Sequence, residues 1–230
     1  MNKVDTKGLG LKEQVLIAAL EYSDGNVNKT FTAEELLVFA WEKNKQAWGL
    51  RSYEEKYPNS DLFYRQLDAQ TNKRGIIDQG LFEKVQKRVY RLTPAGLAVA
   101  AALKPSDPIS REKIDRLLET AVKQIIEHPV FKKWLTDPTG PKYFREAGHF
   151  WGIAPGTPAK TVRERVNSVE QTLKAALKVI EQRGVKEIIE QRGGRVLFDR
   201  KDIERCLEFQ KTLKQRFARD LRMLDPEIEL

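Results

Sequence analysis

Three long polar side chains lie within residues 65–70, and their chemistry suits the edges of nucleic-acid bases. Arg65 can donate two hydrogen bonds to guanine, and Gln66 or Gln70 can pair with adenine. Groups suited to phosphate oxygens flank them, namely Ser60, Tyr64 and Lys73. Phosphate contacts position a protein on a duplex without reading its sequence. These residue types in this order predict contact with a nucleic acid.

A second basic cluster lies in residues 81–92, where the segments LFEKVQ and RVYRL are expected to be extended. The turn between them should fall near Gln86 and Lys87. Lys84, Lys87 and Arg88 then gather at the tip of a hairpin, where they can meet the sugar–phosphate backbone or the minor groove. The alternative is a solvated hairpin on a domain that binds protein.

The overall charge agrees with a polyanionic partner. Lys and Arg total 41 against 33 Asp and Glu, which gives a net charge of +8. A solvated surface with a modest basic excess is the alternative. Hydrophobic residues make up 40% of the 230, enough for one large domain or two small ones.

The sequence offers little for catalysis or metal binding. It contains no Gly-rich phosphate loop and no HExxH, GxSxG or CxxC motif. The single cysteine, Cys206, excludes an internal disulfide and a Cys-rich zinc site, and its apolar position predicts a small core residue. His128 and His149 alone do not make a metal site. We therefore expect no enzyme, no catalytic residue, no metal and no cofactor.

Hydropathy along the chain predicts a cytoplasmic protein with no membrane partner. The first residues show no apolar signal segment. The longest apolar run, Leu97–Leu103, is too short to span a bilayer.

Helical periodicity and caps place the elements that carry the first basic cluster. Helices are predicted over 11–23 and 33–50, the second capped by Thr32 with Glu35 three residues later in a capping box. Residues 51–60 are predicted to be a loop. Ser60 or Asn59 should cap a third helix that is seated by Phe63 and Leu67 and ends before Gly75. After it, Ile76 and Ile77 turn back against the core.

The second cluster leads into a further helix. Thr93 is expected to cap that helix, and Pro94 occupies its first position, where a missing N–H costs nothing. The Ala-rich helix runs to Leu103. Two segments of this half, YRLTPAG (90–96) and FYRQLDAQTNKRGII (63–77), resemble the second wing strand and the recognition helix of MarR-like and PadR-like winged helix-turn-helix regulators.

The resemblance covers roughly residues 11–103, and it implies a helix in the major groove and a wing on the backbone. One departure from the family pattern is Gln70, which stands where an apolar residue is usual. The following glycine, Gly75, comes one residue late. This departure predicts a longer recognition helix, or a kink near Thr71 and Asn72.

The segment KPSDP, residues 104–108, is the predicted domain boundary, with domains at 1–104 and 105–230. Beyond it, helices are predicted over 110–127 and 159–183 and near the C-terminus. The helix over 159–183 carries a heptad stripe of apolar residues, namely Val162, Val166, Val169, Leu173, Ala176 and Ile180. The stripe favours a helical bundle that holds a homodimer. The aromatic residues between 131 and 151 are expected to be core rather than a base-stacking platform.

A second DNA-binding element is the alternative for this half. Residues 143–166, YFREAGHFWGIAPGTPAKTVRERV, can form a helix, a turn and a second helix. The segment GGRVLFDRKDIERCLEF (193–209) resembles the wing strand and final helix of excisionase-like or MerR-like domains, with Asp199 as the helix cap. In that interpretation the DNA contacts are Lys160, Arg163, Asn167, Arg192 and Arg195.

The sequence thus predicts a mostly α protein: a winged helix-turn-helix followed by a helical bundle or a second helix-turn-helix region. The favoured function is sequence-specific binding of double-stranded DNA by a dimeric prokaryotic transcription regulator. Two alternatives remain open. One is a DNA-binding subunit of a replication, mobile-element or anti-phage defence complex, which would have protein partners. The other is a winged-helix adaptor that binds protein.

Overall fold

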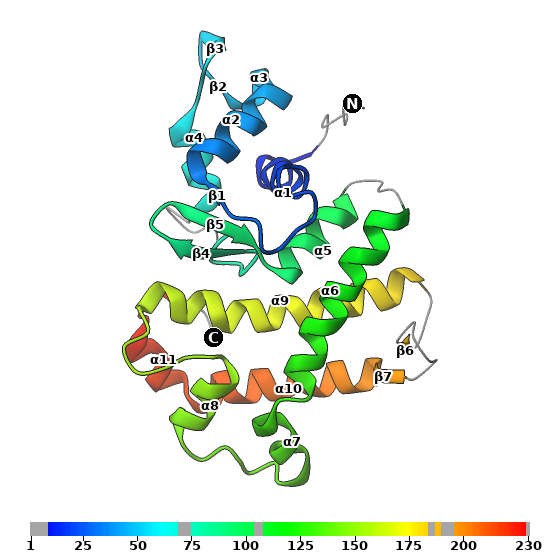
Figure 1. The fold of residues 1–230 in the computed structure, drawn as a ribbon. Helices are drawn as coiled ribbons and strands as arrows, with labels where there is room; N and C mark the ends of the chain where they lie inside the picture. Colours follow the sequence, from blue (N-terminus) through cyan, green and yellow to red (C-terminus); the bar gives the residue numbers. More distant parts are fainter. Residues whose placement is uncertain (1–8, 69–74, 104–107, 184–186, 190–195, 229–230) are drawn as a thin grey trace. The chain divides into compact units, whose positions relative to one another are not determined.

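Helices make up most of this chain, and the strands are short and antiparallel, as expected for a mostly α protein. The computed structural model describes residues 9–68, 75–103, 108–183, 187–189 and 196–228 (Figure 1). Two compact units divide the chain at residues 115 and 116, inside helix α6 (Pro108–Ile126). The predicted boundary at 104–108 falls largely outside the described residues.

Unit 1, residues 1–115, begins with a helix and a short strand and ends with a hairpin and a helix. Its elements before α6 are α1 (Leu11–Tyr22), β1 (Phe31–Thr32), α2 (Ala33–Lys43), α3 (Lys45–Trp48), β2 (Gly49–Leu50), β3 (Tyr53–Pro58), α4 (Ser60–Leu67), β4 (Phe82–Gln86), β5 (Val89–Leu92) and α5 (Pro94–Leu103). The helix α1 packs against both α2 and α5, and α4 packs on α1 and α2.

The main sheet of unit 1 has the strand order β1-β5-β4, with both pairs antiparallel. Phe31 lies opposite Tyr90, and Phe82 lies opposite Leu92. All four of these side chains are buried. The sheet therefore contributes one apolar face to the core that α1, α2 and α5 cover.

The predicted helix caps of unit 1 are confirmed. The Thr32 hydroxyl accepts from the Glu35 N–H at 3.1 Å, and Glu35 Oε2 accepts from the Thr32 N–H at 2.7 Å. Asn59, one of the two predicted caps of α4, accepts from the Leu62 N–H at 3.0 Å. The Thr93 hydroxyl accepts from the Gly96 N–H at 3.0 Å at the start of α5.

Two predictions for residues 33–60 are wrong. The expected helix over 33–50 breaks at Asn44, whose backbone leaves the helical region and whose side chain caps the separate helix α3. The expected loop over 51–60 is mostly an antiparallel hairpin of β2 and β3, which extends away from the main sheet in Figure 1. Ser52 makes its turn in the left-handed region, with φ of 70°.

Unit 2, residues 116–230, is built around two long helices that run side by side in Figure 1. After α6 its elements are α7 (Pro129–Thr136), α8 (Phe144–Phe150), α9 (Ala159–Arg183), β6 (Glu187–Ile189), β7 (Val196–Asp199), α10 (Arg200–Arg216) and α11 (Ala218–Leu224). β6 and β7 pair antiparallel. Asp199 caps α10 as predicted, accepting from the Asp202 N–H at 2.9 Å.

The apolar stripe of α9 is buried inside unit 2, where α9 packs against α10 and α11. Its members are fully buried except for the half-buried Val169. Cys206 lies in the same core from the α10 side, as predicted. The stripe therefore packs within the chain. It no longer supports the predicted homodimer.

Candidate nucleic-acid interface

Helix α4 carries the residues predicted to read bases. Phe63 and Leu67 are fully buried and hold one side of the helix on the core. Arg65 is exposed, and its Nη2 atom lies 2.5 Å from the Asp61 carboxylate one turn earlier. Gln66 turns back on its own helix and donates to the Leu62 carbonyl at 3.3 Å. Of these two candidates, Arg65 is the more accessible to a ligand.

A polar cluster lies behind the core residues on which α4 packs. The ring of Trp48 meets Phe63 edge-on, with centroids 5.6 Å apart. The Trp48 indole N–H donates to Gln14 Oε1 at 3.2 Å, and the Asn44 amide donates to the same oxygen at 3.2 Å. These bonds tie α3 to α1. They fix the residue against which α4 packs.

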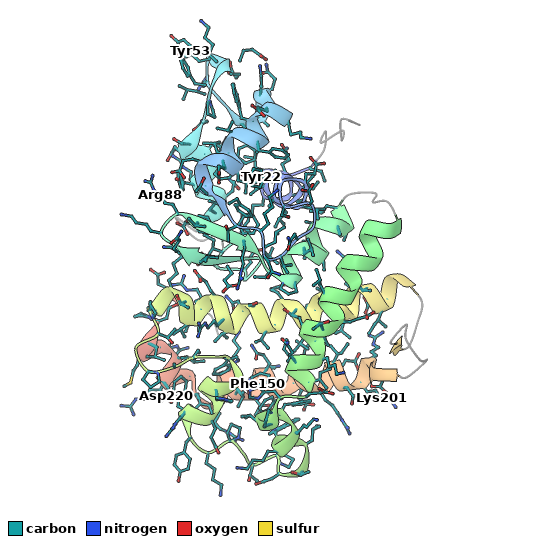
Figure 2. The ribbon with its side chains drawn as sticks, viewed as in Figure 1. Tyr22, Tyr53, Arg88, Phe150, Lys201 and Asp220 are labelled. Carbon is teal, nitrogen blue, oxygen red and sulfur yellow. The ribbon has the colours of Figure 1, made fainter. Side chains whose placement is uncertain are left out.

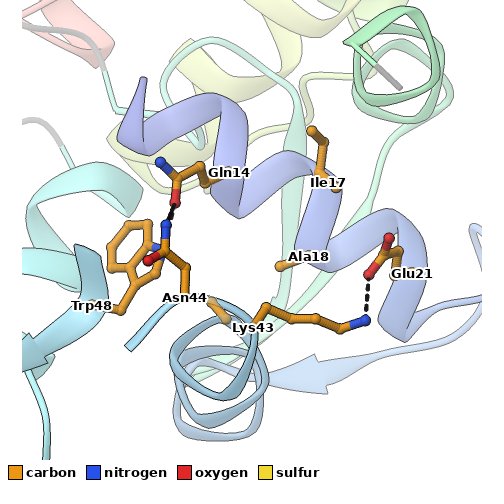
Figure 3. Close-up of a pocket in the computed structure, with 8 residues that line it drawn as sticks. Gln14, Ile17, Ala18, Glu21, Lys43, Asn44 and Trp48 are labelled. Carbon is orange, nitrogen blue, oxygen red and sulfur yellow. Dashed lines mark hydrogen bonds and ion pairs between the residues drawn. The ribbon is translucent and has the colours of Figure 1, made fainter. Parts of the chain in front are cut away.

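A small cavity of about 20 Å³ lies in this cluster, between α1 and α2–α3 (Figure 3). Figure 3 also shows an ion pair among the residues that line it, in which Lys43 Nζ lies 3.0 Å from Glu21 Oε2. This volume holds about one water molecule, whereas small-molecule sites occupy hundreds of cubic ångströms, about 300 or more. The cavity therefore belongs to the packing of the helices and not to an effector site.

The predicted basic hairpin forms, with its turn one residue later than predicted. β4 and β5 pair antiparallel, and Lys87 and Arg88 form the turn, where Arg88 adopts φ of 60°. Lys84, Lys87 and Arg88 are all exposed. Figure 2 labels Arg88 at this turn. The hairpin thus presents three cations near one end.

The base of this hairpin is held tightly against α5. The Thr93 hydroxyl donates to the Gly80 carbonyl at 2.8 Å, and the Thr93 N–H donates to the Leu81 carbonyl at 3.1 Å. A Cβ atom at Gly96 would lie 2.0 Å from that same Leu81 oxygen. Only glycine permits this approach, so the hairpin leaves the core in a defined direction.

The tip of the hairpin meets α4 through Glu34, the second residue of α2. Tyr64 Oη donates to Glu34 Oε1 at 2.8 Å, and Arg88 Nη1 donates to the same oxygen at 2.9 Å. The Arg88 guanidinium also lies over the Tyr64 ring, 5.8 Å from its centroid. The hydrogen bond from Tyr64, with Arg88 nearby, lowers the pKa of Glu34. Burial and the bond to Glu34 raise the pKa of Tyr64.

This contact places Tyr64 and Arg88, two predicted phosphate contacts, on one surface. Ser60 is exposed at the first turn of the same helix, α4. The predicted contacts Gln70 and Lys73 lie outside the described residues. The predicted longer recognition helix is wrong, because α4 ends at Leu67 and the backbone of Asp68 is extended. The alternative, a kink near Thr71 and Asn72, also lies outside the described residues. Glu34 was not a predicted site residue, because its sequence neighbourhood indicates only a helix start.

The β2–β3 hairpin was also missed, and it exposes aromatic side chains. The rings of Tyr53 and Tyr57 pack at 6.2 Å, and both are more than half exposed. Figure 2 labels Tyr53 near the end of this hairpin. Trp41 anchors it by donating from its indole N–H to the Glu54 carbonyl at 2.7 Å. Tyr53 and Tyr57 are four residues apart and lie on the same face of an extended strand, and this spacing was the available sequence signal for β3.

The second predicted DNA-binding element keeps its order of elements but not its contact residues. α8, a turn containing Gly152, and α9 follow one another, and β7 leads into α10. Arg163, however, donates to both carboxylate oxygens of Asp225 and to Glu227, and its side chain is only 16% exposed. In this structure Arg163 is therefore held by a buried carboxylate and does not lie on an open basic surface.

Only two of the other candidates of that element lie within the described residues. Lys160 and Asn167 are half-buried on α9. Arg192 and Arg195 lie outside the described residues. The aromatic residues of this region are mostly core, since Phe131, Phe150 and Trp151 are buried, while Tyr143 is 72% exposed.

Comparison with family models, curated proteins and solved structures finds no match to this chain. Within the described ranges, no helix is both long enough and apolar enough to cross a membrane. Among the same residues, no group of three or more His, Cys, Asp or Glu side chains is placed to hold a metal ion. The interface must therefore be interpreted from its own geometry.

Proposed function

We propose that unit 1 is a winged helix-turn-helix domain that binds double-stranded DNA. In this proposal α4 enters the major groove, and the β4–β5 hairpin is the wing that follows the sugar–phosphate backbone. The order α1, β1, α2, α4, β4, β5, α5 and the sheet order β1-β5-β4 support this assignment. The short helix α3 and the β2–β3 hairpin are then an insertion between α2 and α4.

The observation that carries the proposal is the joining of Tyr64 and Arg88 by one carboxylate. Both side chains donate to the same oxygen. The exposed side of α4 and the tip of the hairpin are therefore close enough for one phosphate group to contact both. A duplex that meets α4 therefore also meets the wing. The basic net charge of the chain favours the same partner.

Selection of bound sequences from a random duplex library tests the proposal with the full chain. Enriched paired half-sites about one helical turn apart would support a dimeric transcription regulator. Binding that depends on DNA shape without an enriched sequence would support a DNA-binding subunit of a larger complex. Absence of duplex binding at low salt would contradict the DNA-binding proposal.

A protein adaptor is the second candidate, and the exposed Tyr53–Tyr57 pair favours it. Tyrosine side chains on a rigid hairpin are common anchors at protein interfaces. The hairpin is rigidly based, because Gly49 packs directly against the Glu54 backbone, where a Cβ would come within 2.4 Å. A protein partner that is lost when both tyrosines are replaced by serine would support this function.

A further inference from the structure

The contact between Glu34, Tyr64 and Arg88 joins three separate elements through one oxygen atom. α2 supplies the carboxylate, α4 supplies the phenol, and the turn between β4 and β5 supplies the guanidinium. The turn is also tied to α2 by its backbone, since the Ala33 N–H donates to the Arg88 carbonyl at 3.1 Å. The oxygen therefore sits at a fixed meeting point of the three elements.

The cap of α2 is not made by Glu34, although Glu34 lies in the first turn and its carboxylate accepts from its own backbone N–H. The Thr32–Glu35 capping box performs that task, with Glu35 Oε2 accepting from the Thr32 N–H. The Glu34 carboxylate instead points to Tyr64 and Arg88. The start of α2 therefore accounts for part of its role and leaves the bonds to Tyr64 and Arg88 unexplained.

A hydroxyl and a guanidinium that converge on one anionic oxygen are the groups by which proteins hold a phosphate. Here the anion is supplied by the chain itself. Both members of the ion pair are open to solvent, with Arg88 64% and Glu34 52% exposed. Exposed ion pairs are weak and screened by salt, so another anion can displace the carboxylate.

We propose that Glu34 occupies the position of a DNA backbone phosphate and competes with it for Tyr64 and Arg88. This inference rests on the proposed DNA binding of unit 1. In the free protein the carboxylate holds the wing tip beside α4. When DNA binds, a phosphate oxygen takes the two hydrogen bonds, and the displaced Glu34 repels the neighbouring phosphates. Glu34 thereby limits affinity for every sequence alike.

Glu34→Gln is the direct test, because it removes the charge while keeping a side-chain oxygen that Tyr64 can reach. We expect the variant to bind duplex DNA about fivefold more tightly near 0.1 M salt, equivalent to about 1 kcal/mol. The dependence of log K on log salt concentration should also steepen by up to about 0.9, one phosphate contact. Fluorescence anisotropy with labelled duplexes measures both quantities.

Glu42→Gln is the matched control. Glu42 is exposed near the other end of the same helix, and the change in net charge is identical. It corrects for the general effect of one negative charge fewer. In an Arg88→Ala background the gain from Glu34→Gln should largely disappear, since Glu34 then has no cation to release. Circular dichroism of each variant confirms that the helical fold is kept.

Two results would overturn the inference while leaving DNA binding intact. One is a gain in Glu34→Gln no larger than in Glu42→Gln. The other is weaker binding in Glu34→Gln, which would make Glu34 a residue that positions Tyr64 and Arg88 for DNA. Failure of the wild type and every variant to bind any duplex at low salt would instead overturn the proposed function, and this inference with it.

Discussion

Arg163 and Asp225 form a two-pronged ion pair inside unit 2. The Nε and Nη2 atoms of Arg163 donate to the two carboxylate oxygens of Asp225 at 2.7 and 2.9 Å. The Asp225 side chain is only 3% exposed. The pair thus joins α9 to the turn after α11 by neutralising a carboxylate that water hardly reaches.

Replacing Arg163 with methionine should destabilise the protein without weakening DNA binding. The change leaves the buried Asp225 carboxylate without its cation, with a backbone bond from Glu227 still in place, so we expect a loss of about 3 kcal/mol in the free energy of unfolding. Urea denaturation of the full chain measures it. Arg205→Met, at an exposed position of α10, is the control and should stay within about 0.5 kcal/mol of wild type. If Arg163→Met lost DNA affinity while its stability stayed unchanged, Arg163 would be a DNA contact after all.

The wing should contribute contacts that do not depend on sequence. Replacing Lys84, Lys87 and Arg88 together with alanine should weaken binding to all duplexes alike. It should also flatten the salt dependence by up to about 2.7, since each phosphate contact contributes about 0.9. The control replaces three exposed lysines of unit 2, namely Lys132, Lys142 and Lys211. If the salt dependence of binding flattened equally in both variants, the wing would not be the part of the protein that contacts the phosphates.

Arg65 should read a base. It is exposed on α4 and paired only with Asp61 of the same helix in the contacts described above. Arg65→Ala should cost about 1–3 kcal/mol on the preferred site and relax the preference at one base pair. Repeating the library selection with the variant measures this. If the selected sequences are unchanged and all duplexes bind less tightly, Arg65 contacts phosphate instead.

Gly96→Ala should be severely destabilising. The added Cβ would lie 2.0 Å from the Leu81 carbonyl oxygen, which itself accepts the Thr93 N–H. Overpacking costs about 1–3 kcal/mol in ordinary cores, and a clash with rigid backbone should lie at or beyond the upper end of that range. Thermal unfolding of Gly96→Ala beside Gly10→Ala measures the effect. Gly10 has room for a Cβ and φ of −65°, so its variant should lose only the cost of alanine at the N-cap of α1, about 1 kcal/mol.

Acid should remove the contribution of the α2 capping box. The N–H and hydroxyl of Thr32 lower the pKa of Glu35 from its ordinary value of 4.5. A carboxyl with a lowered folded-state pKa stabilises the fold above its ordinary pKa and loses that contribution as pH falls through the folded value. The stability difference between wild type and Glu35→Gln should therefore be constant near neutral pH and shrink below pH 4.5. Melting temperatures across a pH series measure it, and a difference independent of pH would contradict the assignment.

Local chemistry made the caps and the buried faces predictable. Thr32 and Glu35 satisfy each other within one helical turn, and Asn59 and Asp199 cap the residues that follow them. The apolar spacing of α9 likewise predicted a buried stripe. The spacing does not say what covers the stripe, since a helix of the same chain and a second subunit would bury it equally well.

The missed features depend on partners that are distant in sequence. The loop prediction for 51–60 rested on Pro58 and Asn59, which disfavour a helix. The strand β3 is held instead by distant partners, namely the Trp41 indole and Lys45, which lies 3.0 Å from Glu55. Arg163 finds Asp225 across the core of unit 2. A basic residue opposite an apolar stripe is usually solvated, and only the folded chain shows the carboxylate that holds it.

The burial of Cys206 decides how this protein can be chemically tagged. It is the single cysteine of the chain, it is fully buried, and burial raises the pKa of its thiol to about 12. At neutral pH it is therefore protonated and shielded from alkylating reagents. Lys87→Cys or Tyr53→Cys would then carry the one reactive thiol of an otherwise native chain. A fluorophore or photo-crosslinker placed at either hairpin would record directly which of the two lies against the bound partner.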